Sequence, residues 1–300
     1  MRGAVAVASI VVASFLSSCG GATGSGGGTG GGAMGGGGGS TGGGAGGSAG
    51  GGVGGGGGTA VDRPCVSSAD GKVYIRNISD WESLVGSGCT SIAGYLVIDA
   101  PGVSVLSPSA TALARVGGLQ VINTALTSLS LPALTTVGLL RVVNNPALTS
   151  LSLPALTTVL WELEVWGDTA LTSLSLPALT TVRFALRFGD TALTSLSLPA
   201  LTVGGVLQVV NNRALTSLSL PALTTLDSVT ASPVFSVFVT KNPALTSLSL
   251  PALRTVGGAL QVFDNTALRQ CLVDAIKNAL TTGPTTYNAT GNNGMPNTCP

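Results

Sequence analysis

The chain contains no histidine and few charged residues. Without an imidazole, Ser-His-Asp and Cys-His nucleophilic arrangements are excluded, and so are most zinc sites. Charged residues make up 8% of the chain, with 13 Lys and Arg against 12 Asp and Glu. No basic patch is present, so nucleic acid and anionic membrane surfaces are poor candidates as partners.

The apolar run at residues 4–16 is too short to cross a bilayer, and no other segment is a candidate for a transmembrane helix. It follows Arg2 and ends in Leu-Ser-Ser before Cys19, a pattern that resembles a bacterial lipobox. The resemblance implies that residues 1–18 are a signal peptide and that Cys19 is the lipidation site. The protein would then have a membrane as its partner through the N-terminal lipid.

Beyond Cys19 the composition changes. Residues 20–60 are almost entirely Gly, Ser, Thr and Ala, which bury no apolar surface and stay disordered. We therefore predict a lipidated cysteine plus a disordered tether over 19–61, followed by one folded domain over 62–300. Gly20 stands where Asp signals inner-membrane retention in some bacteria. We accordingly expect an exported protein, anchored to the cell envelope at the outer membrane or cell surface.

The chain contains five cysteines. With Cys19 assigned to lipid, the other four can form disulfides in an exported protein, in three alternative pairings. We favour Cys65–Cys89 and Cys271–Cys299, because each pair closes a local loop at one end of the domain.

An internal repeat dominates the domain. The ten residues ALTSLSLPAL begin at Ala125, Ala147, Ala170, Ala192, Ala214 and Ala244. Successive copies are separated by 22, 23, 22, 22 and 30 residues, and the longest interval contains an insertion at 227–233. With one weaker copy on each side, the repeat predicts about eight coils.

The spacing of apolar residues indicates the secondary structure. One copy and its continuation read L-x-x-L-x-L-x-x-L and then V-x-x-L-x-V. This spacing and Pro132 argue against a helix, whereas alternation in short bursts indicates short strands. No coil can bury its own leucines, so the coils must stack. We predict a mainly β protein, a parallel β-solenoid of about eight 22–23-residue coils with short capping helices at both ends.

An Asn or Asp precedes the first leucine of each copy by three residues, and short Asx side chains bond free backbone groups at corners. We expect a structural Asx ladder formed by Asn123, Asn145, Asp168, Asp190, Asn212, Asn242 and Asn265. Calcium binding by Asp168 and Asp190 is the alternative. Two carboxylates supply too few oxygens for that, so we assign no metal.

Two helices are predicted as end caps. The S-x-x-E pattern that begins at Ser79 suggests a helix over 80–86, with Ser79 as its N-cap. Thr266 is the expected cap of a C-terminal helix. The apolar stripe of that helix would be Leu268, Cys271, Leu272, Ala275, Ile276 and Ala279.

The start of the domain and its repeating unit resemble a receptor L domain. Cys65 is followed by D-G-K-V-Y-I at 70–75 and G-C-T-S-I-A-G-Y-L-V-I at 88–98, and later units read V-G-G-x-L-Q-V-x-x-N, as at 256–265. The resemblance covers about 65–272 and implies a short right-handed parallel β-helix related to leucine-rich repeats. The family includes ligand-binding lobes of insulin and epidermal growth factor receptors and some fungal cell-wall proteins. No binding residue carries over individually.

Glu162 and Glu164 form the one close pair of glutamates. On a strand the two carboxylates share a face, within range of acid/base chemistry. However, Glu164 falls in the same column as Arg141 and Arg187 on adjacent coils, which favours a cross-strand charge ladder. We therefore expect no enzymatic activity and no cofactor.

The repeats stop matching between residues 161 and 188, where aromatic and charged residues gather. A candidate binding patch there contains Trp161, Glu162, Glu164, Trp166, Arg183 and Arg187. Aromatic residues and Arg are the types that binding hot spots use. The alternative is that Trp166 fills a corner of the coil and the charges only pair with one another. The repeated serines, such as Ser128 and Ser130, would form an outward hydroxyl ladder.

These patterns predict a non-enzymatic recognition or adhesion module that binds a protein or glycan ligand on the solenoid face. A purely structural envelope spacer is the second hypothesis, and an enzyme the third.

Overall fold

The structure is a computed structural model that describes residues 71–107, 110, 112–227 and 235–295. The chain divides into two units, residues 1–57 and 58–300, and every described residue belongs to the second. The predicted signal peptide, the lipidation site Cys19 and the tether lie outside the described residues. So do Cys65, Cys299 and most of the predicted insertion.

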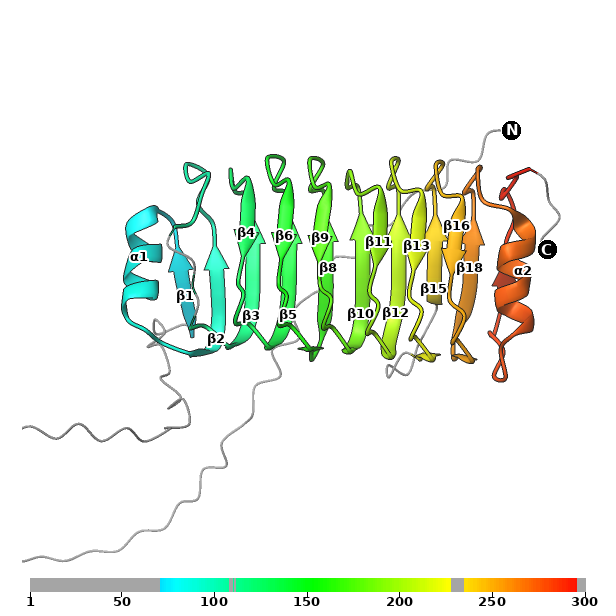
Figure 1. Cartoon of the computed structure of the whole chain (residues 1–300), viewed down its shortest axis with the longest axis horizontal. Coiled ribbons are helices and arrows are strands. Elements are labelled where there is room, and N and C mark those ends of the chain that lie inside the picture. The colour runs from blue at the N-terminus through cyan, green and yellow to red at the C-terminus, as the bar shows by residue number, and fades with distance from the viewer. Residues whose placement is uncertain (1–70, 108–109, 111, 228–234, 296–300) are drawn as a thin grey trace, which may run out of the picture. The chain divides into compact units, whose positions relative to one another are not determined.

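The described chain is a stack of coils whose long strands build one sheet (Figure 1). Every strand pair in it is parallel, which confirms the predicted mainly β solenoid. Its strands are β1 (Lys72–Ile75), β2 (Ser91–Ile98), β3 (Arg115–Ile122), β5 (Thr136–Val143), β7 (Thr158–Val159), β8 (Glu162–Trp166), β10 (Thr181–Gly189), β12 (Val203–Val210), β14 (Thr225–Leu226), β15 (Phe235–Thr240), β17 (Thr255–Val256), β18 (Ala259–Phe263) and β19 (Tyr287–Asn288).

The stack has about nine turns rather than the predicted eight. Strands β1 and β19 lie at the two ends of the main sheet, and neither belongs to a copy of the repeat. Counting copies of the repeat therefore misses turns whose backbone pairs with the stack but whose sequence differs from it.

The Ser-Leu-Ser segments of the repeat form a second wall, which is split in two. One three-stranded sheet contains β4 (Ser128–Ser130), β6 (Ser150–Ser152) and β9 (Ser173–Ser175). The other contains β11 (Ser195–Ser197), β13 (Ser217–Ser219) and β16 (Ser247–Ser249). Because β9 and β11 are not paired, the serine ladder is interrupted between these neighbouring coils.

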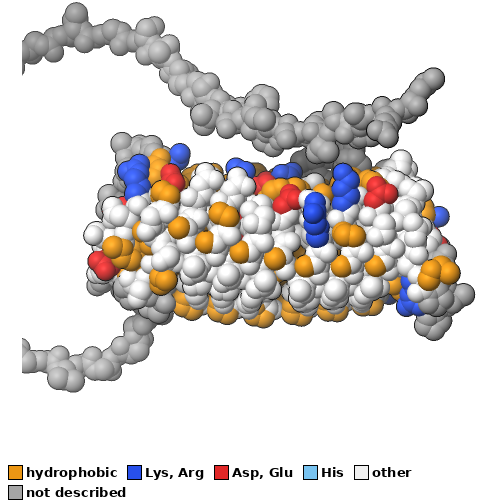
Figure 2. All heavy atoms as spheres, turned by 90° about the horizontal axis from the view of Figure 1, so that it is seen from above, with side chains coloured by type: hydrophobic (Ala, Val, Ile, Leu, Met, Phe, Trp, Pro, Cys, Tyr) orange, Lys and Arg blue, Asp and Glu red, His pale blue; other side chains and the backbone are white. Residues whose placement is uncertain are grey.

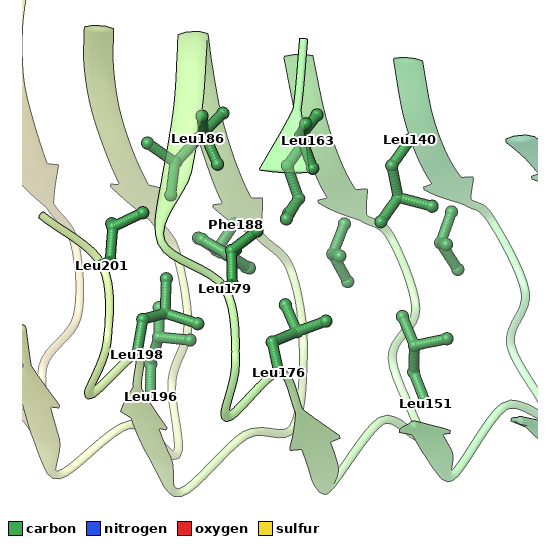
Figure 3. Packing of buried hydrophobic residues seen from close by; sticks show 14 of the residues in the cluster. Leu140, Leu151, Leu163, Leu176, Leu179, Leu186, Phe188, Leu196, Leu198 and Leu201 are labelled. Atoms are coloured by element: carbon green, nitrogen blue, oxygen red, sulfur yellow. The ribbon is translucent and has the colours of Figure 1, made fainter. Parts of the chain in front are cut away.

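The core is a set of leucine and valine columns inside the coils. Figure 3 shows leucines of several coils, among them Leu140, Leu163 and Leu186, directed into the interior of the stack. The predicted inward positions of one unit are all at most 3% exposed: Leu126, Leu129, Leu131, Leu134, Val137, Leu140 and Val142. Each fully buried leucine or valine side chain stabilises the fold by about 1.5–3 kcal/mol through removal of apolar surface from water.

Proline and alanine turn the chain between the two walls. The N–H of Leu134 donates to the carbonyl of Leu131 at 3.3 Å, which closes a turn around Pro132 and Ala133. The same bond recurs in the other copies, for example from Leu156 to Leu153 at 3.1 Å. This repeated turn explains why Pro-Ala is retained in every copy.

Threonine hydroxyls join each coil to the preceding one. Thr157 Oγ1 donates to the carbonyl of Thr135 at 3.1 Å, and Thr180 Oγ1 donates to the carbonyl of Thr157 at 3.0 Å. A second column does the same with Thr149 and Thr127, at 2.9 Å. These hydroxyls donate to backbone acceptors along the exposed surface of the stack.

A helix caps each end, as predicted, although both N-caps differ from the prediction. Helix α1 (Ile78–Gly86) begins after Asn77, whose side chain accepts a hydrogen bond from the Asp80 N–H at 2.9 Å. Ser79 therefore lies inside the helix, because Asn77 already supplies the capping oxygen.

Helix α2 (Gln270–Asn278) begins after Arg269 and has no side-chain cap. Thr266 instead donates its hydroxyl to the carbonyl of Pro243, at 3.4 Å. Val273 and Ile276 are the buried residues of this helix, whereas the predicted stripe members Ala275 and Ala279 are exposed.

Cys89 and Cys271 are both disulfide-bonded. Cys89 follows α1 and Cys271 lies in α2, at opposite ends of the stack (Figure 1), so the two are not bonded to each other. Their predicted partners lie outside the described residues. Neither helix in the described part of the chain has the length and apolar composition to span a membrane.

Candidate functional site

A ladder of buried polar side chains runs along the corner that follows each long strand. Its members are Thr124, Asn145, Asp168, Thr191, Asn212, Asn242, Asn265 and Asn292. Within each run of the ladder, a backbone N–H donates to the side-chain oxygen of the next coil, at 2.8–3.2 Å. Each Asn Nδ2 also donates to a backbone carbonyl, as Asn145 does to Val121 at 3.0 Å.

Two predicted members of the Asx ladder lie elsewhere. Asn123 and Asp190 occupy the preceding column, where the backbone is left-handed, with φ of 54° and 52°. Thr124 and Thr191 take their places in the ladder. Asn and Asp tolerate this backbone region better than most residues, so both columns select the same residue types.

The ladder is interrupted between Asp168 and Thr191. In the described chain no hydrogen bond joins the two side chains, and Asp168 Oδ2 is buried without a partner. Burial raises the pKa of Asp168 to about 7, against hydrogen bonds from Asn145 that lower it. The two carboxylates of the calcium alternative lie in different columns, Asp168 fully buried in the ladder and Asp190 in the outer column. Among the described residues, no three His, Cys, Asp or Glu are grouped to hold a metal ion.

The predicted binding patch lies on two adjacent bulged coils. Three positions separate Val137 from Leu140, but four separate Val159 from Leu163, although both ends of these segments are paired. The extra residue interrupts the strand between β7 and β8, and β10 carries a similar irregularity before Ala185. Bulges redirect side chains and are frequent beside functional sites.

Trp161 and Phe184 project from these two bulges. Their rings stack with centroids 5.0 Å apart and an interplanar angle of 18°. Trp161 remains 56% exposed, compared with 37% for Tyr95. Phe188, in the strand that follows the second bulge, is fully buried in the core. Figure 2 shows one face of the stack, on which charged side chains gather along one edge and hydrophobic side chains recur in rows.

The charged members of the patch form two ion pairs. Arg141 Nε donates to Glu164 Oε2 at 2.7 Å, across neighbouring strands in the predicted column. Arg187 Nη1 lies 2.6 Å from Glu162 Oε1 without hydrogen-bond alignment. Burial raises the pKa of Glu162, while the Arg187 charge lowers it.

The remaining members have separate surroundings. Trp166 is half-buried, and its ring lies over Gly189, where an added Cβ would be 2.5 Å from the ring. Arg183 is exposed on the second bulge and has no ion pair within the described residues. The structure thus brings Trp161, Glu162 and Arg187 together, and separates Trp166 from them as a corner-filling side chain.

An open hollow of about 320 Å³ lies beside the stacked rings. Its lining consists of Tyr95, Gly117, Leu139, Trp161, Glu162 and Phe184. Sequence reasoning missed Tyr95 because it lies more than sixty positions before Trp161. The strand register relates it to the hollow, because Tyr95 pairs with Gly118 of β3 and Gly118 pairs with Leu139 of β5.

No known protein family, curated protein or solved structure matches this chain. The class that the fold defines is that of parallel β-solenoid proteins, and the hollow beside Trp161 is its candidate functional site.

Proposed function

We propose that this chain is a non-enzymatic recognition or adhesion module that binds its ligand through the solenoid face around Trp161. The observation that supports the proposal is the exposed Trp161 ring. It projects from one bulge and is stacked on Phe184, which projects from the bulge of the next coil. Exposing a large aromatic ring to water is unfavourable unless a partner covers it, and such rings commonly anchor interfaces.

The same region argues against catalysis. Both carboxylates that a hydrolytic mechanism would require, Glu162 and Glu164, are engaged with Arg187 and Arg141. An adjacent guanidinium favours the ionised form of a carboxylate. It thereby withholds the proton that a general acid must donate, and it weakens the carboxylate as a general base. We therefore propose binding without turnover.

The location of the protein is part of the proposal. The lipobox-like sequence before Cys19 and the Gly-rich residues 20–60 support an exported protein tethered to the cell envelope by lipid. The resemblance to receptor L domains supports a ligand-binding rather than an enzymatic role.

The test is an adhesion assay with the full lipidated chain displayed on cells or beads. We expect Trp161→Ala to abolish attachment to the surface that the parent protein recognises. The matched control is Arg213→Ala, which changes an exposed side chain on a different corner of the stack. Attachment that is unchanged in Trp161→Ala would refute the proposed site.

The second candidate, a structural envelope spacer, is supported by the near-identity of the repeats. Six copies of one segment provide the same turns, leucine columns and threonine ladder, and none of these requires a ligand. A spacer predicts that deletion of whole coils alters the envelope, whereas Trp161→Ala has no effect.

A further inference from the structure

We propose that the hollow between Tyr95 and Trp161 binds an uncharged oligosaccharide, with sugar rings stacked on the two aromatic side chains. This inference rests on the proposed function and specifies its ligand class. It depends on the bulges that project from some coils, on the aromatic rings that line the hollow and on the charge of the surrounding side chains.

The hollow exists because unbulged coils lie between bulged ones. Strand β2 carries a register shift before Tyr95, and the coil of β7 and β8 carries the bulge at Trp161. The two coils between them lack the extra residue. Three strand steps separate β2 from β8, a distance of about 14 Å.

The two coils between Tyr95 and Trp161 carry glycines, so no side chain at these positions fills the hollow. A Cβ at Gly117 would lie 2.1 Å from the Ala93 carbonyl oxygen, and one at Gly138 would lie 2.0 Å from the Gly117 carbonyl oxygen. Backbone packing between these coils therefore leaves no room for a side chain. The floor consists of backbone and the half-buried Leu139.

The two walls are aromatic faces. The Tyr95 ring lies over Gly118, where an added Cβ would be 2.4 Å from the ring, and Tyr95 is 37% exposed. Trp161 also lines the hollow, and its ring is stacked on that of Phe184, a further lining residue. The apolar C–H face of a pyranose stacks on such rings, and its hydroxyls require polar partners nearby. The Tyr95 hydroxyl, the Trp161 indole N–H and the Glu162 carboxylate are polar side-chain groups of the lining.

The charge of the site fits an uncharged ligand. Among the described residues that line the hollow, Glu162 is the only charged one, and it is paired with Arg187. The neighbouring pair of Arg141 with Glu164 is also neutral overall. Arg183, which is exposed beside Phe184 and has no ion pair within the described residues, does not line the hollow. An anionic polysaccharide or a nucleic acid would find no excess of positive charge in the lining.

A peptide fits the hollow less well. Strands β3 and β5 on its floor are paired with neighbours on both sides, so no free strand edge is available for β-augmentation. A peptide would have to be recognised by side-chain contacts alone, on a floor that carries almost no side chains.

The experiment is a calorimetric titration of the full chain with β-1,4-linked glucose oligomers, β-1,4-linked N-acetylglucosamine oligomers and α-1,4-linked glucose oligomers. We expect at least one of the three to bind, and expect Trp161→Ala and Tyr95→Ala each to weaken that binding at least tenfold. Leu160→Ala is the matched control, because Leu160 is an exposed neighbour on the same bulge that does not line the hollow. Trp161→Phe should restore part of the affinity.

Quenching by acrylamide gives a second readout. Trp81 is buried and Trp161 is the most exposed tryptophan, so a bound oligosaccharide should protect the fluorescence of Trp161. Absence of binding by all three oligomer series, or equal binding by Trp161→Ala, would overturn the oligosaccharide assignment. If oligosaccharides fail but Trp161→Ala still abolishes adhesion, the ligand class is wrong and the proposed function survives.

Discussion

At the scale of single residues, Asp168 is the least expected feature of the chain. The sequence Gly-Asp-Thr-Ala-Leu occurs both at 167–171 and at 189–193. In the first copy the aspartate is fully buried in the ladder, whereas in the second it lies in the outer column at φ 52°. The identical pentapeptides occupy different positions in their coils because Trp166, the residue before the first copy, pairs with Gly189, the first residue of the second copy.

The raised pKa of Asp168 makes stability depend on pH. The carboxyl group ionises near 3.8 in an unfolded chain but near 7 in the folded protein. Folding therefore favours its protonated form, and this contribution to the free energy of unfolding is fully present below pH 4. It is lost as the pH rises through about 7, to an extent on the order of 2–4 kcal/mol.

Replacing Asp168 by Asn should remove this dependence. The Asn amide can donate to a backbone carbonyl, as Asn145 does, and it carries no charge at any pH. We expect Asp168→Asn to raise the free energy of unfolding by about 2 kcal/mol at pH 8 and to change it little at pH 4. Urea titrations across this pH range measure the effect; equal stability of the two proteins at pH 8 would contradict the assigned burial.

At the scale of strands and turns, most of the architecture was predictable from spacing. The leucines from Leu126 to Leu134 gave the inward columns, and Pro132 gave the turn. The bulges were not predictable, because spacing between repeats conceals them. From Leu163 to Leu186 the interval is 23 residues, and from Leu186 to Leu207 it is 21, although the copies that begin at residues 170, 192 and 214 are each 22 apart.

That concealed difference explains the errors in the Asx ladder. Counting back from the repeated leucine assigns Asp190 to the ladder, but the true register follows from the paired core residues of the strands. The candidate patch was located because its composition changes, whereas the hollow required knowledge of which coils carry an extra residue.

Glycines at the coil contacts provide a test at this scale. An alanine at Gly138 would place Cβ 2.0 Å from a backbone oxygen that cannot move without displacing its strand. We expect Gly138→Ala to destabilise the protein by about 1–3 kcal/mol. The matched control is Gly86→Ala at the end of α1, where an added Cβ meets nothing within 4 Å. Thermal unfolding compares the two, and equal midpoints would contradict the described coil contact.

At the scale of the whole molecule, the six repeats act as a wall and the departures from them define a site. The leucine columns, the proline turns and the threonine hydroxyls serve the stack itself. The split between β9 and β11 and the break after Asp168 fall at the same pair of coils, so the stack consists of two runs of matched units. Repetition in the sequence predicts the stacked coils, whereas the strand pairing between neighbouring coils is needed to locate the bulges.

The central claim is that function lies in the bulge at Trp161 rather than in the repeat. The most direct measurement replaces Leu-Trp-Glu at 160–162 with Gly-Leu, the residues at 138–139 of an unbulged coil, and compares adhesion of the full chain with its thermal unfolding. The account predicts that cooperative unfolding is retained, because the flattened coil matches the coil of β5, and that adhesion is lost. Adhesion that persists in the flattened variant would contradict it.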